Sequence, residues 1–203
     1  MKIVLASNNQ NKIKEIKSIL GRIGCQYEVL SLDAIGFHDE IIEDGNSFEE
    51  NSLIKARAVS TLGYIGIADD SGLCVDALNG EPGIYSARYA GEPCDHQKNN
   101  EKIIAALDGK EDPERSAAFV SVIACSLPNG KSFTVRGECK GKMLKAPQGN
   151  GGFGYDPLFM PEGFDKTFAE LSFDEKNGIS HRGRALEAFA ERFPSFLKDN
   201  DVY

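Results

Sequence analysis

Apolar positions along the chain follow two spacings, short continuous runs and recurrences every three or four residues. The run over residues 3–6 predicts a buried strand, and the recurrence after it predicts a helix that ends at Gly21 or Gly24. The apolar positions of this helix are Ile13, Ile16, Ile19 and Leu20. A strand, a turn and a helix in this order are typical of α/β proteins.

Further strands are expected over residues 65–68, 118–127 and 131–139, the last two joined by a hairpin turn at 128–130. Such an antiparallel pair makes the sheet mixed. Residues with capping side chains predict helix starts at Ser47, Asp95, Ser172 and Ser180. At 203 residues the chain fits one α/β domain, 1–203, with a central mixed β-sheet flanked by helices.

Two of these helices carry more specific expectations. The helix after Ser47 is expected to end near Gly63, and the helix after Ser172 is expected to break at Gly178. The apolar positions that the first of them is expected to bury are Ile54, Ala58, Val59 and Leu62.

The acidic composition limits the kinds of binding partner that the protein can have. A net charge of -8 and a pI of about 5.0 speak against a nucleic-acid polymer as partner, because such a partner needs an extended basic face. A small phosphate ligand remains compatible, provided that a few lysines and arginines or a metal ion supply positive charge locally. The five cysteines form no C-x-x-C pair, and no segment is long and apolar enough to span a membrane. We therefore expect a cytoplasmic protein.

Two adjacent carboxylates follow the strand expected over 65–68. Asp69 and Asp70 precede Ser71 and Gly72, which predict the turn that stops the strand. Ligands of open α/β sheets bind at strand ends of this kind. Because successive side chains point to opposite faces, one aspartate is expected to do chemistry and the other to anchor structure. The alternative is that both bond the backbone of the turn.

The turn between the first strand and the first helix is rich in amides. A helix N-terminus carries free N–H groups and about half a positive charge, which favour a bound anion. A lysine in the same turn adds a full charge. The alternative is an asparagine cap with a solvated lysine. The residues of this turn are Ser7, Asn8, Asn9, Gln10, Asn11 and Lys12.

Residues 38–50 contain six acids and neither lysine nor arginine. Such a run usually forms a solvated face, yet one inward carboxylate would suit magnesium, which binds one or two carboxylates plus ligand phosphates. Lys55 follows on the next helix, where it is either a second phosphate cation or a solvent-facing side chain, and the general tendency favours the second.

Two segments near the C-terminus complete the set of candidates. Glycines surround Phe153 between 149 and 157, so the backbone can approach a flat ligand while the ring offers a stacking face. The alternative is a loop whose aromatic residues join the core. His181 and Arg182 lie in the first turn of the last helix, where cations oppose the helix dipole and so indicate a bound anion or ligand carbonyl. Taken together, these segments indicate a nucleoside triphosphate site in which water attacks and Asp70 is the base or metal ligand.

The motifs resemble the inosine triphosphate pyrophosphatase family, also called the dITP/XTP or non-standard purine NTP pyrophosphatases. The resemblance extends over nearly the whole chain. It rests on Ser7-x-Asn9-x-x-Lys12, Glu43, Asn51, Lys55, Ala68-Asp69-Asp70-Ser71-Gly72-Leu73, Gly83-Ile84-Tyr85-Ser86-Ala87-Arg88-Tyr89, Gly151-Gly152-Phe153-Gly154-Tyr155-Asp156-Pro157, Lys176 and Ser180-His181-Arg182-Gly183.

The resemblance implies a magnesium-dependent homodimer that hydrolyses a nucleoside triphosphate to the monophosphate and pyrophosphate. It also implies elongated subunits with a cleft between two lobes. Asp70 would be the proton acceptor and a metal ligand, with Glu43 as a second metal-site carboxylate. The triphosphate would bind to 7–12, Lys55 and Ser71. The nucleotide and its base would bind to Phe153, Gly154, Tyr155, Asp156, Lys176, His181 and Arg182.

Two alternatives remain open from the sequence. One is a Maf-type pyrophosphatase that acts on modified pyrimidine nucleotides, and another is a nucleotide-binding module without turnover. A haloacid-dehalogenase-type phosphatase is disfavoured, because its D-x-D signature is absent at Asp69.

Overall fold

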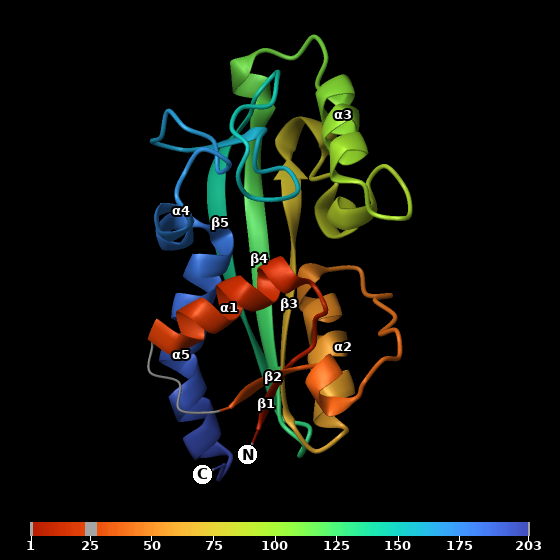
Figure 1. Ribbon diagram of the computed structural model, residues 1–203, viewed down its shortest axis with the longest axis vertical. Coiled ribbons are helices and arrows are strands. Elements are labelled where there is room, and N and C mark those ends of the chain that lie inside the picture. The colour runs from red at the N-terminus through yellow and green to blue at the C-terminus, as the bar shows by residue number, and fades with distance from the viewer. Residues whose placement is uncertain (1, 23–27, 203) are drawn as a thin grey trace. The chain divides into compact units, whose positions relative to one another are not determined.

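The computed structural model describes residues 2–22 and 28–202 (Figure 1). The strands are β1 (Ile3–Leu5), β2 (Val29–Ser31), β3 (Ile65–Val75), β4 (Ser116–Ser126), β5 (Ser132–Met143) and β6 (Phe159–Pro161). The α-helices are α1 (Gln10–Arg22), α2 (Phe48–Ser60), α3 (His96–Ala106), α4 (Phe173–Ile179) and α5 (His181–Asp199). Short 3₁₀ turns occupy Asp33–Ile35, Asp76–Leu78, Gly83–Arg88 and Asp112–Arg115. The predicted helix stop at Gly24 lies outside the described residues.

The strands form one mixed sheet in the order β2-β1-β3-β4-β5-β6. β1 pairs in parallel with both β2 and β3, whereas β5 and β6 are antiparallel. Leu5 lies opposite Ile67, so β1 ends two residues before the level of Asp69 on β3. The predicted α/β class and mixed sheet flanked by helices are confirmed.

The predicted turn at Ser71-Gly72 is wrong, because β3 continues through both residues to Val75. Pairing with the neighbouring strand β4 decides the conformation there, since strand formation depends on tertiary context more than on the residue types. The two aspartates therefore lie in the middle of a strand. The neighbouring strand β1 ends before it reaches their level, which leaves the side of β3 next to the aspartates without a paired strand residue of β1.

Several other boundaries differ from expectation. The strand expected over 131–139 extends to Met143, because Gly141 and Met143 pair with β6. The short strands β2 and β6 were not predicted, and α4 continues past Gly178 to Ile179. Three-residue strands contain too few positions to establish an alternating pattern.

The predicted capping residues agree with the structure better than the predicted strand boundaries do. The side chains of Ser47, Asp95 and Ser172 accept hydrogen bonds from backbone N–H groups three residues later. The expected buried face of α2 is partly wrong, since Leu62 lies beyond the helix and is 49% exposed, while Val59 is buried.

Contacts divide the chain into two compact units. Unit 1 contains the described residues of 1–70, 121–137 and 182–203, and unit 2 those of 71–120 and 138–181. In unit 1, α1 and α5 pack on one face of the strands, in the cluster that contains Ile67 and Ile123 (Figure 1). On the other face, α2 packs against Ala68 and Ala124.

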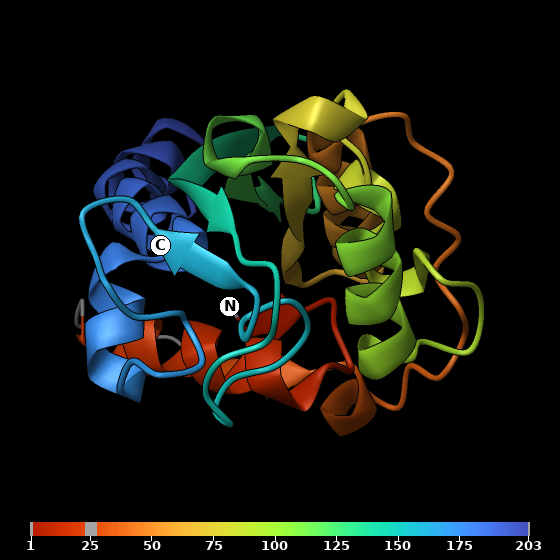
Figure 2. The ribbon, with the colours of Figure 1, turned by 90° about the horizontal axis from the view of Figure 1, so that it is seen from above.

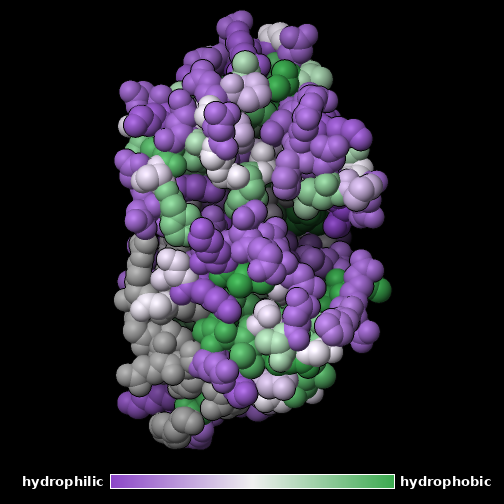
Figure 3. All heavy atoms as spheres, in the orientation of Figure 1, coloured by the Kyte–Doolittle hydropathy of each residue, from purple (hydrophilic) through white to green (hydrophobic). Residues whose placement is uncertain are grey.

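Unit 2 is built around a second apolar cluster. Leu73 from β3 and Ile103 from α3 pack with Phe119, Phe159 and Phe168. The rings of Phe119 and Phe159 meet edge to face, with their centroids 4.8 Å apart. Helices α3 and α4 lie on the two sides of the unit 2 strands in both views (Figures 1 and 2). The outer faces of α1 and α3 are polar (Figure 3).

No helix in the described parts of the chain is both long and apolar enough to cross a membrane. The described cysteines, Cys74, Cys94, Cys125 and Cys139, are free thiols.

Candidate functional site

The side chains of Asp69 and Asp70 leave β3 on opposite faces, as adjacent strand residues must. Asp69 lies on the face covered by α1 and α5, and Asp70 on the face covered by α2. Since no turn forms at these residues, the alternative in which both aspartates hold a turn is wrong. The partners of the two carboxylates come instead from distant segments.

Asp69 is fully buried and binds three donors. Its Oδ1 accepts a hydrogen bond from the hydroxyl of Ser121 at 2.5 Å. Its Oδ2 lies 2.9 Å from Nζ of Lys12 and 3.3 Å from Nη2 of Arg182. Both oxygens of this carboxylate are therefore occupied.

Arg182 is itself 2% exposed and pairs with Glu15 as well as with Asp69. Two acids thus balance the two cations Lys12 and Arg182. Burial alone would lower the pKa of Arg182, but Asp69 and Glu15 raise it above its usual value. The cation at the start of α5 is therefore compensated by two protein carboxylates.

The same partners set the protonation of Asp69. Burial by itself would raise its pKa, but the charges of Arg182 and Lys12 and the hydrogen bond from Ser121 hold the pKa well below the usual 3.8. Asp69 therefore stays ionised at neutral pH and is poorly suited to accept a proton.

Asp70 has a different environment. Its Oδ1 lies 2.9 Å from Nζ of Lys55, whereas its Oδ2 is buried and has no hydrogen-bond partner among the described residues. Burial raises the pKa of Asp70 above its usual value, against the opposing charges of Lys55 and Lys12. One oxygen of this carboxylate is held in place and the other is available for a ligand or a proton.

Lys55 joins Asp70 to the acidic loop before α2. Its Nζ also lies 2.7 Å from Oε2 of Glu43. Burial would lower the pKa of Lys55, but the two carboxylates raise it. At 7% exposed, Lys55 is buried, so the preference for a solvent-facing side chain is wrong. Asn51, one turn earlier, accepts a hydrogen bond from the backbone N–H of Gly45 at 2.9 Å and so holds the same loop.

A hard cation could use this cluster. Oδ2 of Asp70, which has no partner among the described residues, is an oxygen ligand of the type that magnesium prefers. Glu43 supplies a second carboxylate, since it pairs with the same lysine, Lys55, as Asp70 does. Groups of three or more His, Cys, Asp or Glu side chains suited to a metal do not occur among the residues that the structure describes. A cation here would therefore need further ligands from water or from a bound phosphate.

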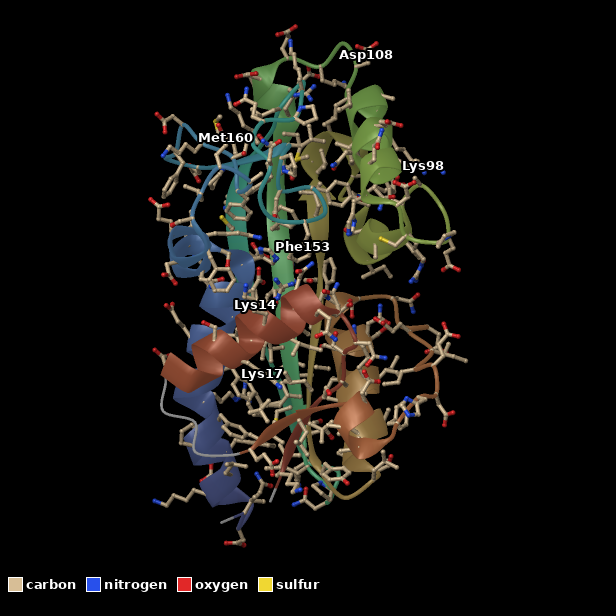
Figure 4. The ribbon with its side chains drawn as sticks, in the orientation of Figure 1. Lys14, Lys17, Lys98, Asp108, Phe153 and Met160 are labelled. Atoms are coloured by element: carbon tan, nitrogen blue, oxygen red, sulfur yellow. The ribbon has the colours of Figure 1, made fainter. Side chains whose placement is uncertain are left out.

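The turn before α1 forms a cap of its own. Oδ1 of Asn9 accepts hydrogen bonds from the backbone N–H groups of Asn11 and Lys12, at 3.0 and 3.2 Å. Ser7 accepts a third from Asn9. The asparagine cap is thus confirmed, but the lysine is not solvated, because Lys12 pairs with Asp69. Lys14 and Lys17 lie on the exposed side of α1 (Figure 4).

In unit 2, a buried ion pair shapes the glycine-rich loop. Asp156 accepts a hydrogen bond from the backbone N–H of Phe153 at 2.8 Å and pairs with Nζ of Lys176 at 2.7 Å. The same ammonium lies 5.0 Å from the centroid of the Phe153 ring, within cation–π range. Phe153 is half-buried and projects from the loop before β6 (Figure 4).

Gly152 permits this arrangement. It has a φ of +72°, and a Cβ at this position would lie 2.8 Å from Cβ of Asp156 and collide with its carboxylate. Gly154 has a similar φ of +64°, but a Cβ added there would meet no other atom within 4 Å. Of these two glycines, only Gly152 combines the backbone requirement with a close approach to another residue.

Tyr155 and His181 were expected among the nucleotide-binding residues. The side chain of Tyr155 is instead 4% exposed, and its hydroxyl donates a hydrogen bond to the carbonyl of Ser86 at 2.7 Å. It anchors the loop from within the core, as the alternative for this aromatic residue predicts. His181 is also buried and stacks on Phe119, with centroids 4.8 Å apart.

The structure thus gathers the candidates in two groups. Unit 1 holds the turn at 7–12 with Glu43, Lys55, Asp70 and Arg182, whereas Ser71, Phe153–Asp156, Lys176 and His181 belong to unit 2. Two further residues of unit 1 that contact these candidates, Glu15 and Ser121, were not predicted. Nothing in the sequence near Ser121 indicates a site. The cations at the start of α5 indicated a bound anion or ligand carbonyl, but the structure pairs Arg182 with the protein carboxylates of Glu15 and Asp69.

Known proteins resemble this chain over nearly its full length. The model of the Ham1 family matches residues 3–192. The dITP/XTP pyrophosphatase of Desulforamulus reducens is 48% identical over 192 residues, covering 94% of each chain. That of Bacillus subtilis is 48% identical over 189 residues, covering 93% of this chain and 94% of its own.

Solved structures agree in fold. The Staphylococcus aureus Ham1 protein superposes with a TM-score of 0.86 at 41% identity, covering 96% of this chain and 99% of its own. The nucleoside-triphosphatase, or dITP/XTP pyrophosphatase, of Mycobacterium abscessus superposes with a TM-score of 0.78 at 45% identity, covering 93% and 98%.

Exchanging each aspartate for asparagine should separate their contributions to stability. Asp69→Asn leaves the buried Arg182 and the partly buried Lys12 with one acid and should lower the free energy of unfolding by about 3–5 kcal/mol. Asp70→Asn should change it by less than about 1 kcal/mol, because burial already disfavours that charge. Urea unfolding at pH 7 measures both, and equal losses would contradict the assignment.

The pH dependence of stability should differ accordingly. The lowered pKa of Asp69 gives stabilisation that is fully present above 3.8 and is lost as the pH falls through the folded-state pKa. Asp70 has the opposite sign, since its raised pKa makes stability fall as the pH rises just above 3.8. Asp69→Asn should therefore flatten the loss of stability in acid, as urea unfolding at a series of pH values would measure.

Alanine at two neighbouring glycines should test the loop. Both Gly152→Ala and Gly154→Ala should lower the free energy of unfolding by about 1–2 kcal/mol, because alanine disfavours the left-handed backbone conformation. Only Gly152→Ala should cost about 1–3 kcal/mol more, because it displaces the buried Asp156 from Phe153 and Lys176. Equal free energies of unfolding for the two variants would show that the contact with Asp156 has no weight.

Proposed function

This chain belongs to the Ham1 family, and from that premise we propose that it hydrolyses non-standard purine nucleoside triphosphates, namely ITP, dITP and XTP, to the monophosphate and pyrophosphate. Removal of such nucleotides would cleanse the nucleotide pool. The observation that carries the proposal is Asp70, a buried carboxylate with one oxygen fixed by Lys55 and the other without a partner among the described residues.

Unit 1 supplies the groups for the triphosphate. Lys12 and Lys55 provide positive charge that an acidic protein must place locally, and the backbone of residues 7–12 lies at the start of α1, where the helix dipole favours an anion. Ser71 follows Asp70 on β3 and completes the proposed phosphate contacts.

Magnesium fits the same cluster. Asp70 and Glu43 would hold it, with remaining ligands from water and the phosphates. When bound, the ion neutralises charge on the phosphates and lowers the pKa of coordinated water. Asp70 is proposed as the proton acceptor, because burial raises its pKa toward the range of a general base while Lys55 keeps Oδ1 fixed. The occupied oxygens of Asp69 make it the less suitable proton acceptor and so support the choice of Asp70.

Unit 2 supplies groups for the nucleotide and its base. The ring of Phe153 offers a stacking face, and the ion pair of Asp156 with Lys176 sets its loop. The backbone at Gly154 can approach a flat ligand closely, and the buried Tyr155 holds the loop through its hydrogen bond to Ser86. His181 is proposed to recognise the keto oxygen at position six. Arg182 is assigned to Asp69 and Glu15 instead, since both its terminal nitrogens bind these acids.

A cytoplasmic homodimer, as the resemblance implies, is part of the same proposal. The Maf-type alternative and the module without turnover are not favoured, because the relatives carry the name dITP/XTP pyrophosphatase.

Product analysis tests the reaction. With ITP and Mg²⁺, phosphorus NMR should detect inosine monophosphate and pyrophosphate, because hydrolysis cleaves the anhydride bond between the α- and β-phosphates. Asp70→Asn should reduce turnover by about 10²–10⁴-fold, the usual contribution of a general base, while ITP binding persists. Release of inosine diphosphate and orthophosphate, or no turnover by the unmodified protein, would refute the proposal.

Substrate comparison tests the base. The kcat/KM for ITP, dITP and XTP should exceed that for ATP by as much as about 10⁴-fold, because the amino group of adenine would leave a buried donor unpaired. GTP measured alongside reports on position two. Equal kcat/KM for ATP and ITP would exclude recognition at position six.

A further inference from the structure

Ser121 stands out in the middle of β4. Its side chain is fully buried, on the strand face that also carries Ile123 and Cys125. Across this face, β3 contributes Ile65 and Ile67 to the same cluster. A hydroxyl in such a stripe is unfavourable unless it is hydrogen-bonded. The Ser121 hydroxyl meets this need by donating the 2.5 Å hydrogen bond to Oδ1 of Asp69.

This bond determines how the carboxylate of Asp69 is turned. The terminal torsion of an aspartate is broad, so a carboxylate held on one side only can rotate. Ser121 binds Oδ1, which leaves Oδ2 facing the two cations, Lys12 and Arg182. Arg182 has a second acid in Glu15. Lys12, whose side chain is 17% exposed, has the easier route to solvent if Asp69 turns away.

We propose that Ser121 is a positioning residue for the reaction: it fixes the carboxylate of Asp69 and thereby holds the ammonium of Lys12 at the start of α1. The role rests on the proposed function, in which Lys12 binds the triphosphate. Ser121 touches neither substrate nor metal in this assignment and acts only through Asp69.

Ser126 provides a matched control on the same strand. It is equally buried, and its hydroxyl lies 2.9 Å from that of Ser60, so Ser126→Ala also removes a buried hydrogen bond. It belongs to no group assigned to the site. Any effect of Ser121→Ala that exceeds that of Ser126→Ala therefore reports on Asp69 and Lys12.

The expected result is a defect in phosphate binding. Ser121→Ala should raise the KM for ITP and the dissociation constant of pyrophosphate by about 10-fold or more, the usual weight of a hydrogen bond to a charged group, while kcat changes much less. Ser126→Ala should leave both constants within about twofold. Pyrophosphate binding, measured by calorimetry in the presence of Mg²⁺, requires no turnover.

A double mutant identifies the route. If Ser121 acts through Lys12, the loss of pyrophosphate affinity caused by Ser121→Ala should disappear in the Lys12→Ala background. An equal loss in both backgrounds would overturn the proposal, as would equal effects of Ser121→Ala and Ser126→Ala. Should Ser121→Ala fail to fold, Ser121→Cys keeps the side-chain shape, slightly enlarged, with a weaker donor and should weaken pyrophosphate binding, whereas unchanged binding would overturn the proposal.

The inference and the proposed function fail in different ways. If the unmodified protein releases no pyrophosphate from ITP, the proposed function fails. If it does, and Ser121→Ala binds pyrophosphate as tightly as the control, only the role of Ser121 fails.

Discussion

The rest of the site depends on two adjacent carboxylates in one strand, of which one has polar partners at both oxygens and the other at only one. The pleat of β3 sends Asp69 to the face of α1 and α5 and Asp70 to the face of α2. Asp69 has both oxygens occupied, and loss of its charge would remove the acid partner of Lys12 and one of the two acid partners of Arg182. Asp70 has one oxygen held by Lys55 and one without a partner among the described residues. The anchoring carboxylate and the proposed proton acceptor are thereby neighbours in the chain.

The acidic chain supplies positive charge through fixed lysines. Each lysine assigned to the candidate site is held by an aspartate, in the pairs Lys12–Asp69, Lys55–Asp70 and Lys176–Asp156. A buried pair contributes little net stability, but its geometry is well defined. In the proposed function, this arrangement lets a protein with a net charge of -8 present cations to a polyphosphate without a basic surface.

Periodicity predicts most of the fold, because burial of one face per element is a local property of the sequence. Helix caps follow for the same reason. The predicted end of β3 is wrong, since Ser71 and Gly72 favour a turn only until a neighbouring strand pairs with them. Lys55 was expected in solvent because a polar residue on a helix normally faces water, and its two acidic partners come from other segments. Ser121 and Glu15 could not be predicted, as each acts on a residue far away in the sequence.

A crystal structure with a non-hydrolysable ITP analogue and Mg²⁺ would decide whether the two aspartates divide their roles in this way. We predict a metal ion bound by Oδ2 of Asp70, at about 2.0–2.1 Å, while Asp69 keeps Lys12 and Arg182. A metal ion bound by Asp69, with Asp70 taking no part, would contradict the division.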